Sequence, residues 1–528
     1  MRNACFSTFL ALILCCAVNA QTADRPARPD YGLLLHPGEA GHNEAEVVAL
    51  MEKAKNARIN TIILLVKDPA GLYYASKLFP NAVVPAYKNF DLLSAVIIAA
   101  HKRGMRVEAW LADFVEGKNS WAYTNHPEWA ELNPDGQTTL SEIGADGKSY
   151  QDVWMCPARR PGYVDQYLLP IVGEIVRNYP IDGIQHGFAR YPGDLNPDGY
   201  CFCDYCLKDV FVHSHLVYDS EPNIAPLVRV FPRIDADLAR EYTPKPPHWD
   251  EWTRREKAIF FLHGRYEYDS SPDMSYFFYT YRTDVVKDFM HEAQEIVKGI
   301  RPEVTISAAV FKNPLTGGRF LGQRWSEWTY FVDEFTPMTF RNQFNGSWNT
   351  FLQEFGEYTR YQKRWVANRK LNQSIYIPAL YKEMIDPIHR MSSASDQWLA
   401  LGSGGGAQRS EILRSSQVTL AQLPEGNRKS ELKTAILNVP KEINSETDRA
   451  KLSELRHVNE RLLSNPPIGF FPPRRLLEAI QVARENGADG IILYGASTVE
   501  GGDLWETVRE GSNDGNPARP VTVSAPNR

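Results

Sequence analysis

The sequence predicts a closed eight-stranded β/α barrel, a fold of the TIM-barrel class, and three observations lead to this prediction. Eight short apolar runs are spread along the chain of 528 residues. Most of these runs are separated by segments in which apolar residues recur at helical spacing. Polar side chains follow several of the runs, as they do in barrels that bind their ligands at the carboxyl ends of the strands. The length permits one such α/β domain with insertions.

The first half of the chain contains four of the expected strands: Tyr31–His36, Asn60–Val66, Arg106–Leu111 and Ile181–Ile184. The second of these is rich in branched apolar residues, which is typical of a strand buried on both faces. Amphipathic patterning predicts helices over three segments between them: Glu44–Asn56, Asp91–Gly104 and Tyr163–Tyr179.

The second half supplies the other four strands: Val304–Val310, Phe331–Thr339, Ser374–Tyr381 and Gly490–Tyr494. Helices are expected at Tyr279–Ile300 and Arg474–Asn486. Two insertions interrupt the pattern, one at about 207–272 with little periodicity and one at about 403–465, which is polar, charged and expected to be partly helical. The barrel is therefore predicted to span 21–510, followed by a flexible tail at 511–528.

Residues 1–20 have the pattern of a signal peptide. Arg2 provides a positive end, Phe9–Val18 provides a short apolar run, and small residues precede Gln21. The run is too short for a stable membrane anchor, and no later segment resembles a membrane span. We therefore expect a secreted or periplasmic protein. Lipid attachment at Cys15 or Cys16 is the alternative, which the bulky residues before them disfavour.

Composition and motifs narrow the classes of partner. The formal charge of −6 provides no basic field, so nucleic acid is not an expected partner. The twelve tryptophans would suit a carbohydrate cleft, although most are expected in the core. The sequence contains no P-loop, no G-x-G-x-x-G after a strand, no H-E-x-x-H and no G-x-S-x-G elbow. No organic cofactor is expected.

Four cysteines remain after the signal segment: Cys156, Cys201, Cys203 and Cys206. A C-x-C-x-x-C motif with one distant cysteine suits a tetrahedral zinc site with four thiolate ligands. An exported protein could instead form two disulfides. Both alternatives give the cysteines a structural role, because either would fasten the loop after the fourth strand to the region of Cys156.

Several blocks of the sequence occur together in a recognisable order. They are Phe90–Leu93 with Ala99–Gly104, Val107–Trp110, His126–Trp129, Tyr179–Pro192, Trp325–Met338 and Gly487–Gly490. In this order they resemble the bacterial glycosyl hydrolase family 10-like barrel proteins, and the resemblance spans about residues 31–505. It implies a TIM barrel that acts on glycans such as peptidoglycan or other polysaccharides. The cysteines are similar to the four-cysteine zinc site of glycoside hydrolase family 42 β-galactosidases, which supports zinc.

Two departures from the family pattern concern the site. The fourth strand of family members usually continues D-G-I-x-x-D, but here Gly187 stands at the position of the second carboxylate. Where relatives often carry histidine in the third strand, this chain has Glu108.

Glycoside hydrolysis generally requires two carboxyl groups, and in a barrel they lie at the carboxyl ends of strands. Glu383 follows the seventh expected strand, at a position that resembles that of the nucleophile in many barrel glycosidases, and Asp113 follows the third. Glu383 could instead be a loop carboxylate paired with Lys382, and Asp113 could be a helix cap. Seven residues are expected to bind substrate: His36, Lys67, Glu108, His186, Arg190, Lys312 and Tyr494. Glu108 could instead complete a salt bridge deep in the barrel.

The first hypothesis is an exported glycoside hydrolase-like protein that cleaves a polysaccharide with Glu383 and Asp113. The alternative is a catalytically degenerate barrel that binds glycans, which Gly187 favours. A third hypothesis makes the positive side chains at the mouth an anion-binding or lyase site.

Overall fold

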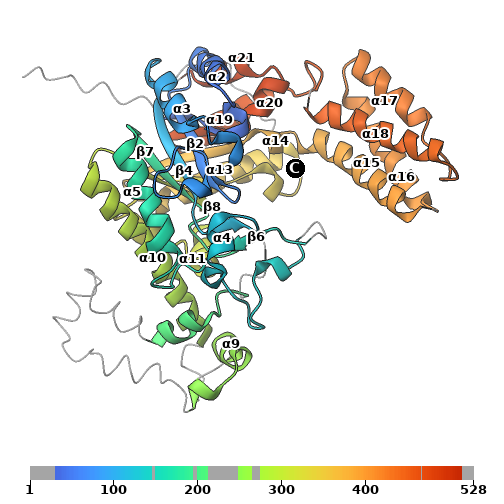
Figure 1. Cartoon of the computed structure of the whole chain (residues 1–528). Helices are drawn as coiled ribbons and strands as arrows, with labels where there is room; N and C mark the ends of the chain where they lie inside the picture. Colours follow the sequence, from blue (N-terminus) through green and yellow to red (C-terminus); the bar gives the residue numbers. More distant parts are fainter. Residues whose placement is uncertain are drawn as a thin grey trace, which may run out of the picture.

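The computed structural model of the protein describes residues 30–144, 149–193, 195, 199–211, 248–263, 274–402, 404–464 and 466–513. The expected signal peptide, most of the first insertion and the tail from residue 514 lie outside the described residues. Eight parallel strands form the centre of the molecule (Figure 1): β1 Tyr31–Leu35, β2 Thr61–Asp68, β4 Arg106–Ala112, β7 Gly183–Gly187, β8 Thr305–Phe311, β9 Glu334–Met338, β10 Lys370–Tyr376 and β11 Gly490–Tyr494.

The sheet closes on itself because β1 pairs with both β2 and β11. Leu33 lies opposite Ile62 on one side and Leu493 on the other. Closure removes the free edges that an open sheet would expose. The predicted fold class is therefore confirmed. Short β3 (Gly71–Leu72) adds an antiparallel hairpin to the end of β2, and β5 (Val115–Gly117) pairs with β6 (Asp152–Trp154) outside the barrel.

Helices surround the strands: α2 Glu44–Asn56, α3 Leu92–His101, α5 Leu169–Asn178, α10 Met274–Ile300, α13 Trp348–Trp365, α19 Pro473–Glu485 and α21 Trp505–Gly511. Several begin at a side-chain cap. The side-chain oxygens of Asn43 and Asp91 accept hydrogen bonds from the backbone N–H groups of Glu46 and Ser94, which fixes the starts of α2 and α3. None of the helices in the described part of the chain is both long enough and apolar enough to cross a membrane.

One expected strand was misplaced. The prediction put it at Ser374–Tyr381, but β10 ends at Tyr376 and the next residues form the short helix α14, Ile377–Leu380. Pro378 explains the change, because proline lacks the N–H that a central strand needs and is tolerated in the first turn of a helix. Glu383 therefore lies in the first turn of α15 (Lys382–Leu401) and not directly after a strand.

The second insertion forms a helical arm. The insertion comprises α16 (Gly406–Gln422), α17 (Asn427–Leu437) and α18 (Glu446–Ser464), and the arm is completed by α15, which precedes it; the four helices project from the barrel in Figure 1. Side chains such as Trp398, Ile412 and Leu455 are buried within the arm. The sequence predicted an insertion that is only partly helical, and the structure forms three helices over most of it.

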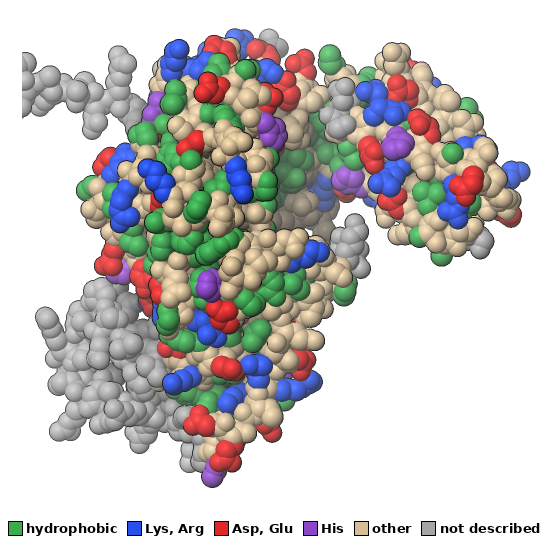
Figure 2. Space-filling model, in the orientation of Figure 1, with side chains coloured by type: hydrophobic (Ala, Val, Ile, Leu, Met, Phe, Trp, Pro, Cys, Tyr) green, Lys and Arg blue, Asp and Glu red, His purple; other side chains and the backbone are tan. Residues whose placement is uncertain are grey.

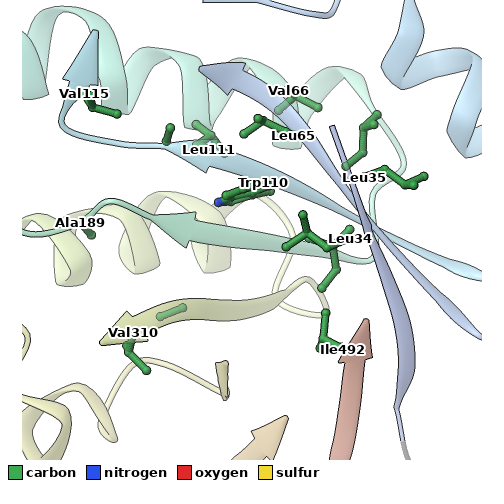
Figure 3. Close-up of a cluster of buried hydrophobic side chains, with 14 of the residues drawn as sticks. Leu34, Leu35, Leu65, Val66, Trp110, Leu111, Val115, Ala189, Val310 and Ile492 are labelled. Atoms are coloured by element: carbon green, nitrogen blue, oxygen red, sulfur yellow. The ribbon is translucent and has the colours of Figure 1, made fainter. Parts of the chain in front are cut away.

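The barrel interior is layered. At the amino ends of the strands, Arg106, Glu108 and Glu334 form a cluster of ionisable side chains. Above them Leu34, Ile492 and Trp110 fill the middle of the barrel (Figure 3). The carboxyl ends of the strands then form the mouth. Outside the barrel, lysines and arginines are interspersed with acidic side chains over the face that Figure 2 shows, which fits the absence of a basic field.

Candidate functional site

Aromatic side chains from five strand ends meet at the mouth of the barrel. His36 follows β1, Trp110 lies on β4, Phe340 follows β9, and Tyr376 and Tyr494 end β10 and β11. The rings of Tyr376 and Tyr494 stack with centroids 4.7 Å apart, and Phe340 lies 5.4 Å from Tyr376. His36 lies 5.4 Å from Tyr494 and 5.7 Å from Trp110. We call these five residues the aromatic row.

Four members of the row are half-buried, so their rings are both held in place and accessible; only Trp110 is buried. Nε2 of His36 and the hydroxyl of Tyr494 are hydrogen-bonded at 2.7 Å. Burial raises the pKa of Tyr494 to about 12, helped by the nearby Tyr376, so this hydroxyl keeps its proton at neutral pH. The sequence placed His36 and Tyr494 at the mouth, and the structure brings them together.

Glu39 supports this arrangement. One carboxylate oxygen accepts a hydrogen bond from the backbone N–H of His36 at 3.0 Å, and the other accepts one from Ser497 at 2.9 Å. The carboxylate thereby ties the short helix α1 (Pro37–Ala40) after β1 to α20 (Ala496–Gly501) after β11. Its charge contributes, after burial, to the raised pKa of Tyr376.

Trp110 occupies the space above Gly187. A Cβ atom added to Gly187 would lie far closer to Nε1 of Trp110 than the 3.0 Å that real Cβ atoms keep. The indole nitrogen is buried and has no hydrogen-bond partner among the described residues. The indole thus fills the position at which a carboxylate on this strand would enter the mouth.

Glu383 is held by two arginines. Its two carboxylate oxygens lie 2.5 Å from Nη2 of Arg341 and 2.6 Å from Nη1 of Arg475. Burial raises the pKa of Glu383, but the hydrogen bond from Arg475 and the charges of both arginines outweigh it, so the pKa lies below its ordinary value. The carboxylate connects the base of the helical arm to the loop after β9 and to α19.

Asp113 and His186 lie together but away from the mouth. Both are fully buried, and Nδ1 of His186 is 3.1 Å from the Asp113 carboxylate. Successive residues of a strand point to opposite faces. Because Gly187 faces the barrel interior, His186 faces outward, where its ring contacts Phe289 of α10 at 5.5 Å. Burial raises the pKa of Asp113, and the neighbouring His186 opposes this effect.

Lys67 is also buried outside the mouth. A shift in register between Leu65 and Lys67 turns its side chain toward the end of β4. Its ammonium group donates hydrogen bonds to the carbonyl oxygens of Ala112 and Val115 at 2.5 and 2.8 Å, and forms an ion pair with Glu116 at 2.8 Å. Lys67 and His186 were expected to line the mouth, but both side chains are buried outside it.

The other predicted ligands of substrate are engaged in the fold. Ser307 donates a hydrogen bond to Glu108 at 2.7 Å, at the opposite end of the barrel from the mouth. The guanidinium group of Arg190 lies 4.8 Å above the ring of Trp154. The ammonium group of Lys312 donates to the carbonyl of Gln343 at 2.9 Å.

We had expected these side chains to surround the mouth as hydrogen-bond donors, and their observed positions differ from that expectation. Glu108 and Arg190 are buried, and Lys312 lies 4.4 Å above the ring of Phe344. Burial lowers the pKa of Lys312. Their roles in substrate binding stay predictions, since their positions do not place them in the aromatic row.

Sequence reasoning missed Phe340 and Tyr376. Tyr376 fell in the middle of a strand that was predicted to continue to Tyr381, so its place at the mouth was not visible. Pro378 was the available signal, because a proline inside an expected central strand argues that the strand ends before it. Phe340 stands directly after the expected strand Phe331–Thr339 and carried no other signal.

The four cysteines form a buried cluster beside the loop after β7. Their sulfur atoms all lie within 4.8 Å of one another, and Cys156 is 3.7 Å from Cys203 and 3.5 Å from Cys206. A disulfide requires about 2.05 Å between sulfur atoms, so these cysteines are not paired in disulfides. Four thiolates around one zinc ion, each about 2.3 Å from it, would stand about 3.8 Å apart. The donor set and its spacing are compatible with a metal site.

The aromatic row lies at the carboxyl ends of the strands, where β/α barrels place their functional sites. Residues 37–398 match the family described as Glycosyl hydrolase-like 10, and the chain belongs to this family. The resemblance found in the sequence blocks is thereby confirmed.

Individual relatives are more distant. Over 162 residues the chain is 28% identical to the glycosyl hydrolase DigH of Escherichia coli (strain K12), which corresponds to 28% of this chain and 35% of DigH. DigH of Shigella flexneri matches with the same values. The match spans about a third of the length of these curated relatives. The glycoside hydrolase domain of PgaB (BpsB) from Bordetella bronchiseptica is 11% identical with a TM-score of 0.50, over 92% of this chain and all of that chain, and shows the fold alone.

Proposed function

We propose that the protein binds a polysaccharide at the mouth of its barrel. The aromatic row carries this proposal. Sugar rings have apolar faces that stack on aromatic side chains, while polar groups such as His36 and the Tyr494 hydroxyl can bond to sugar hydroxyls. Membership of the Glycosyl hydrolase-like 10 family supports a carbohydrate ligand.

Cleavage of the glycan is the second candidate, favoured by the family and by two pKa shifts in the expected directions. The arginines hold Glu383 ionised, as a nucleophile must be, and burial favours a protonated Asp113, as a general acid requires. Substrate would, however, have to reach Asp113, which is fully buried, and displace one of the arginines from Glu383. Binding alone is therefore the function that the geometry supports best.

One experiment separates the two candidates. The purified protein is incubated with a panel that includes peptidoglycan, β-galactans and acidic or sulfated glycans, and both affinity and new reducing ends are measured. Tyr376→Ala should weaken binding about tenfold through loss of a stacking face. Tyr123→Ala, which removes a half-exposed tyrosine outside the aromatic row, should leave binding unchanged.

The outcomes are distinct. Binding without new reducing ends supports the binding barrel. New reducing ends that disappear in Glu383→Gln at unchanged stability support hydrolysis with Glu383 in the site. If no glycan binds, or if Tyr376→Ala and Tyr123→Ala behave alike, the mouth is not the binding site.

We also propose that the four cysteines hold a structural zinc ion and that the protein is exported. The sulfur spacing and the thiolate donor set support zinc. The signal-peptide pattern of residues 1–20 supports export to the periplasm or the medium. Detection of the mature chain, beginning near Gln21, in either compartment would test the second proposal.

A further inference from the structure

A groove runs along the outer wall of the barrel between α10, α11 (Pro314–Leu321), α12 (Trp325–Trp328) and the end of α13. It consists of two adjoining pockets of about 610 and 460 Å³. Both pockets are lined by Ser326 and Trp365, so the groove is continuous past the indole of Trp365. Each volume is large enough for a small ligand. The groove can therefore accommodate more than one unit of an extended molecule.

No residue of the aromatic row lines the groove. Trp365 ends α13, and β10 begins five residues later at Lys370, so this part of the groove lies near the amino ends of the strands. The mouth lies at their carboxyl ends. At the other end of the groove, α11 begins three residues after the carboxyl end of β8, so a ligand in the groove is distinguished from one in the mouth by the side chains that it contacts.

The lining of the groove is cationic. It includes Arg319, Arg324 and Arg364 and no carboxylate. Arg324 is neutralised by Glu327 at 2.6 Å. Arg319 and Arg364 are exposed, and neither forms an ion pair with any residue that the structure describes. In a chain with a formal charge of −6, two uncompensated arginines in one groove form a local site for a negative group.

Aromatic and hydroxyl groups complete the lining. Trp365 and Tyr361 are half-buried, with ring centroids 6.1 Å apart at 71°, so each presents part of a ring to the groove. Ser326 and Thr329 add hydroxyl groups. Aromatic faces suit the apolar faces of sugar rings, and the planar guanidinium group binds a carboxylate or sulfate with two parallel hydrogen bonds.

We infer that this groove is a second binding site, for a segment of an acidic polysaccharide that carries carboxylate or sulfate groups. Arg319 and Arg364 bind the acidic groups, and Trp365 stacks on a sugar ring between them. The choice of a sugar polymer over another polyanion rests on the proposed function. A nucleic acid is disfavoured because the site offers only two arginines without an ion pair among the described residues, whereas nucleic-acid binding typically neutralises many phosphates.

The test uses the full mature chain and three acidic polymers: polygalacturonate, alginate and chondroitin sulfate. Binding is measured by titration calorimetry at low and high salt. The methyl ester of polygalacturonate serves as the uncharged counterpart of the same sugar chain. The variants are Arg319→Gln with Arg364→Gln, and Trp365→Ala. Arg414→Gln, at an exposed arginine on the helical arm, is the matched control, and Tyr376→Ala reports on the mouth.

We expect at least one acidic polymer to bind, with an affinity that falls at high salt. The double arginine variant and Trp365→Ala should each lower this affinity about tenfold or more, whereas Arg414→Gln leaves it unchanged. The methyl ester should bind about tenfold more weakly than polygalacturonate.

Three results would overturn the inference: binding of none of the three polymers, equal binding of acid and ester, or binding that survives the double arginine variant. Tighter binding of single-stranded DNA through the same arginines would replace the glycan by a nucleic acid. Failure of the mouth proposal gives a different result. Tyr376→Ala would then leave the affinity for neutral glycans unchanged, while the groove variants would still weaken the binding of acidic polymers.

Discussion

The indole of Trp110 occupies the space that any side chain on Gly187 would need. The two residues lie on adjacent paired strands, β4 and β7, and both face the barrel interior. Packing, and not only chemistry, therefore excludes a carboxylate at position 187 in this chain. The large residue and the glycine form one unit, in which the missing Cβ makes room for the ring.

This relationship predicts that Gly187→Ala destabilises the protein by roughly 1–3 kcal/mol, because the added methyl group overpacks the interior against Trp110. Chemical denaturation measures the effect. In a Trp110→Leu background the same substitution should cost less, since the smaller side chain leaves room. Gly38→Ala is the matched control, because a Cβ at Gly38 meets no atom within 4 Å. Equal costs of Gly187→Ala in both backgrounds would contradict this explanation.

The position of Glu383 leads to a second prediction. Arg341 has a fully buried side chain, and its guanidinium group would lose its ion pair with Glu383 in Glu383→Gln. We expect the free energy of unfolding to fall by about 1–2 kcal/mol, less than for a fully buried pair because Glu383 itself is 34% exposed. A purely catalytic carboxylate would instead show lost turnover at unchanged stability.

The pH dependence of this effect has a defined sign. The pKa of Glu383 is lower in the folded protein than its ordinary value of 4.5, so its contribution to stability is present above that pH and is lost as the pH falls below it. Urea denaturation at pH 7 and pH 3.5 measures this loss. Glu425→Gln is the control, since Glu425 is 82% exposed and pairs only with Lys429 in the described ion pairs. If the two substitutions change the free energy of unfolding equally at both pH values, the ion pairs of Glu383 do not stabilise the fold more than an exposed pair does.

The barrel could be predicted from the sequence because its strands are short continuous apolar runs. The run at Thr61–Val66 is buried on both faces, and such runs are visible without knowledge of tertiary contacts. The site was harder to predict. Strand alternation decides whether a residue faces the barrel or the helices, and an error of one position reverses the direction, as it did for His186.

Long-range contacts explain the other differences. The register shift that buries Lys67 and the arginines that hold Glu383 come from segments that are distant in the sequence. No local pattern announces them. The cysteines are the opposite case, because three of them lie within six residues and their spacing alone brought their sulfur atoms together.

The cysteine cluster predicts about one zinc ion per chain in protein purified without chelator, measured by elemental mass spectrometry. Cys206→Ser should lose the metal and lower the free energy of unfolding by about 2 kcal/mol or more, because metal binding contributes directly to folding. Thiol titration of the mature chain from Gln21, chelated, denatured and unreduced, should find four reactive thiols. Two disulfides would leave none, and that result together with absent zinc would reject the metal site.

The charged layer at the amino ends of the strands predicts an unusual pH profile. Burial, followed by the nearby carboxylate of Glu334, raises the pKa of Glu108 from 4.5 to about 8. The folded protein therefore holds a proton on Glu108 that the unfolded chain releases, so the free energy of unfolding falls as the pH rises from about 4.5 to 8 and levels off above that. Glu334, whose pKa is also raised by burial, acts in the same direction.

Replacing Glu108 with glutamine tests this account, because the amide matches the shape of the protonated carboxyl group and cannot ionise. Urea denaturation between pH 4.5 and 8.5 should show a smaller decline for Glu108→Gln than for the wild type, with a difference of roughly 1–3 kcal/mol at pH 8. The variant should also keep a hydrogen bond from Ser307, which lies 2.7 Å from Glu108. If both proteins lose stability in parallel over this range, Glu108 is ionised in the fold, and Arg106 at 3.3 Å compensates its charge.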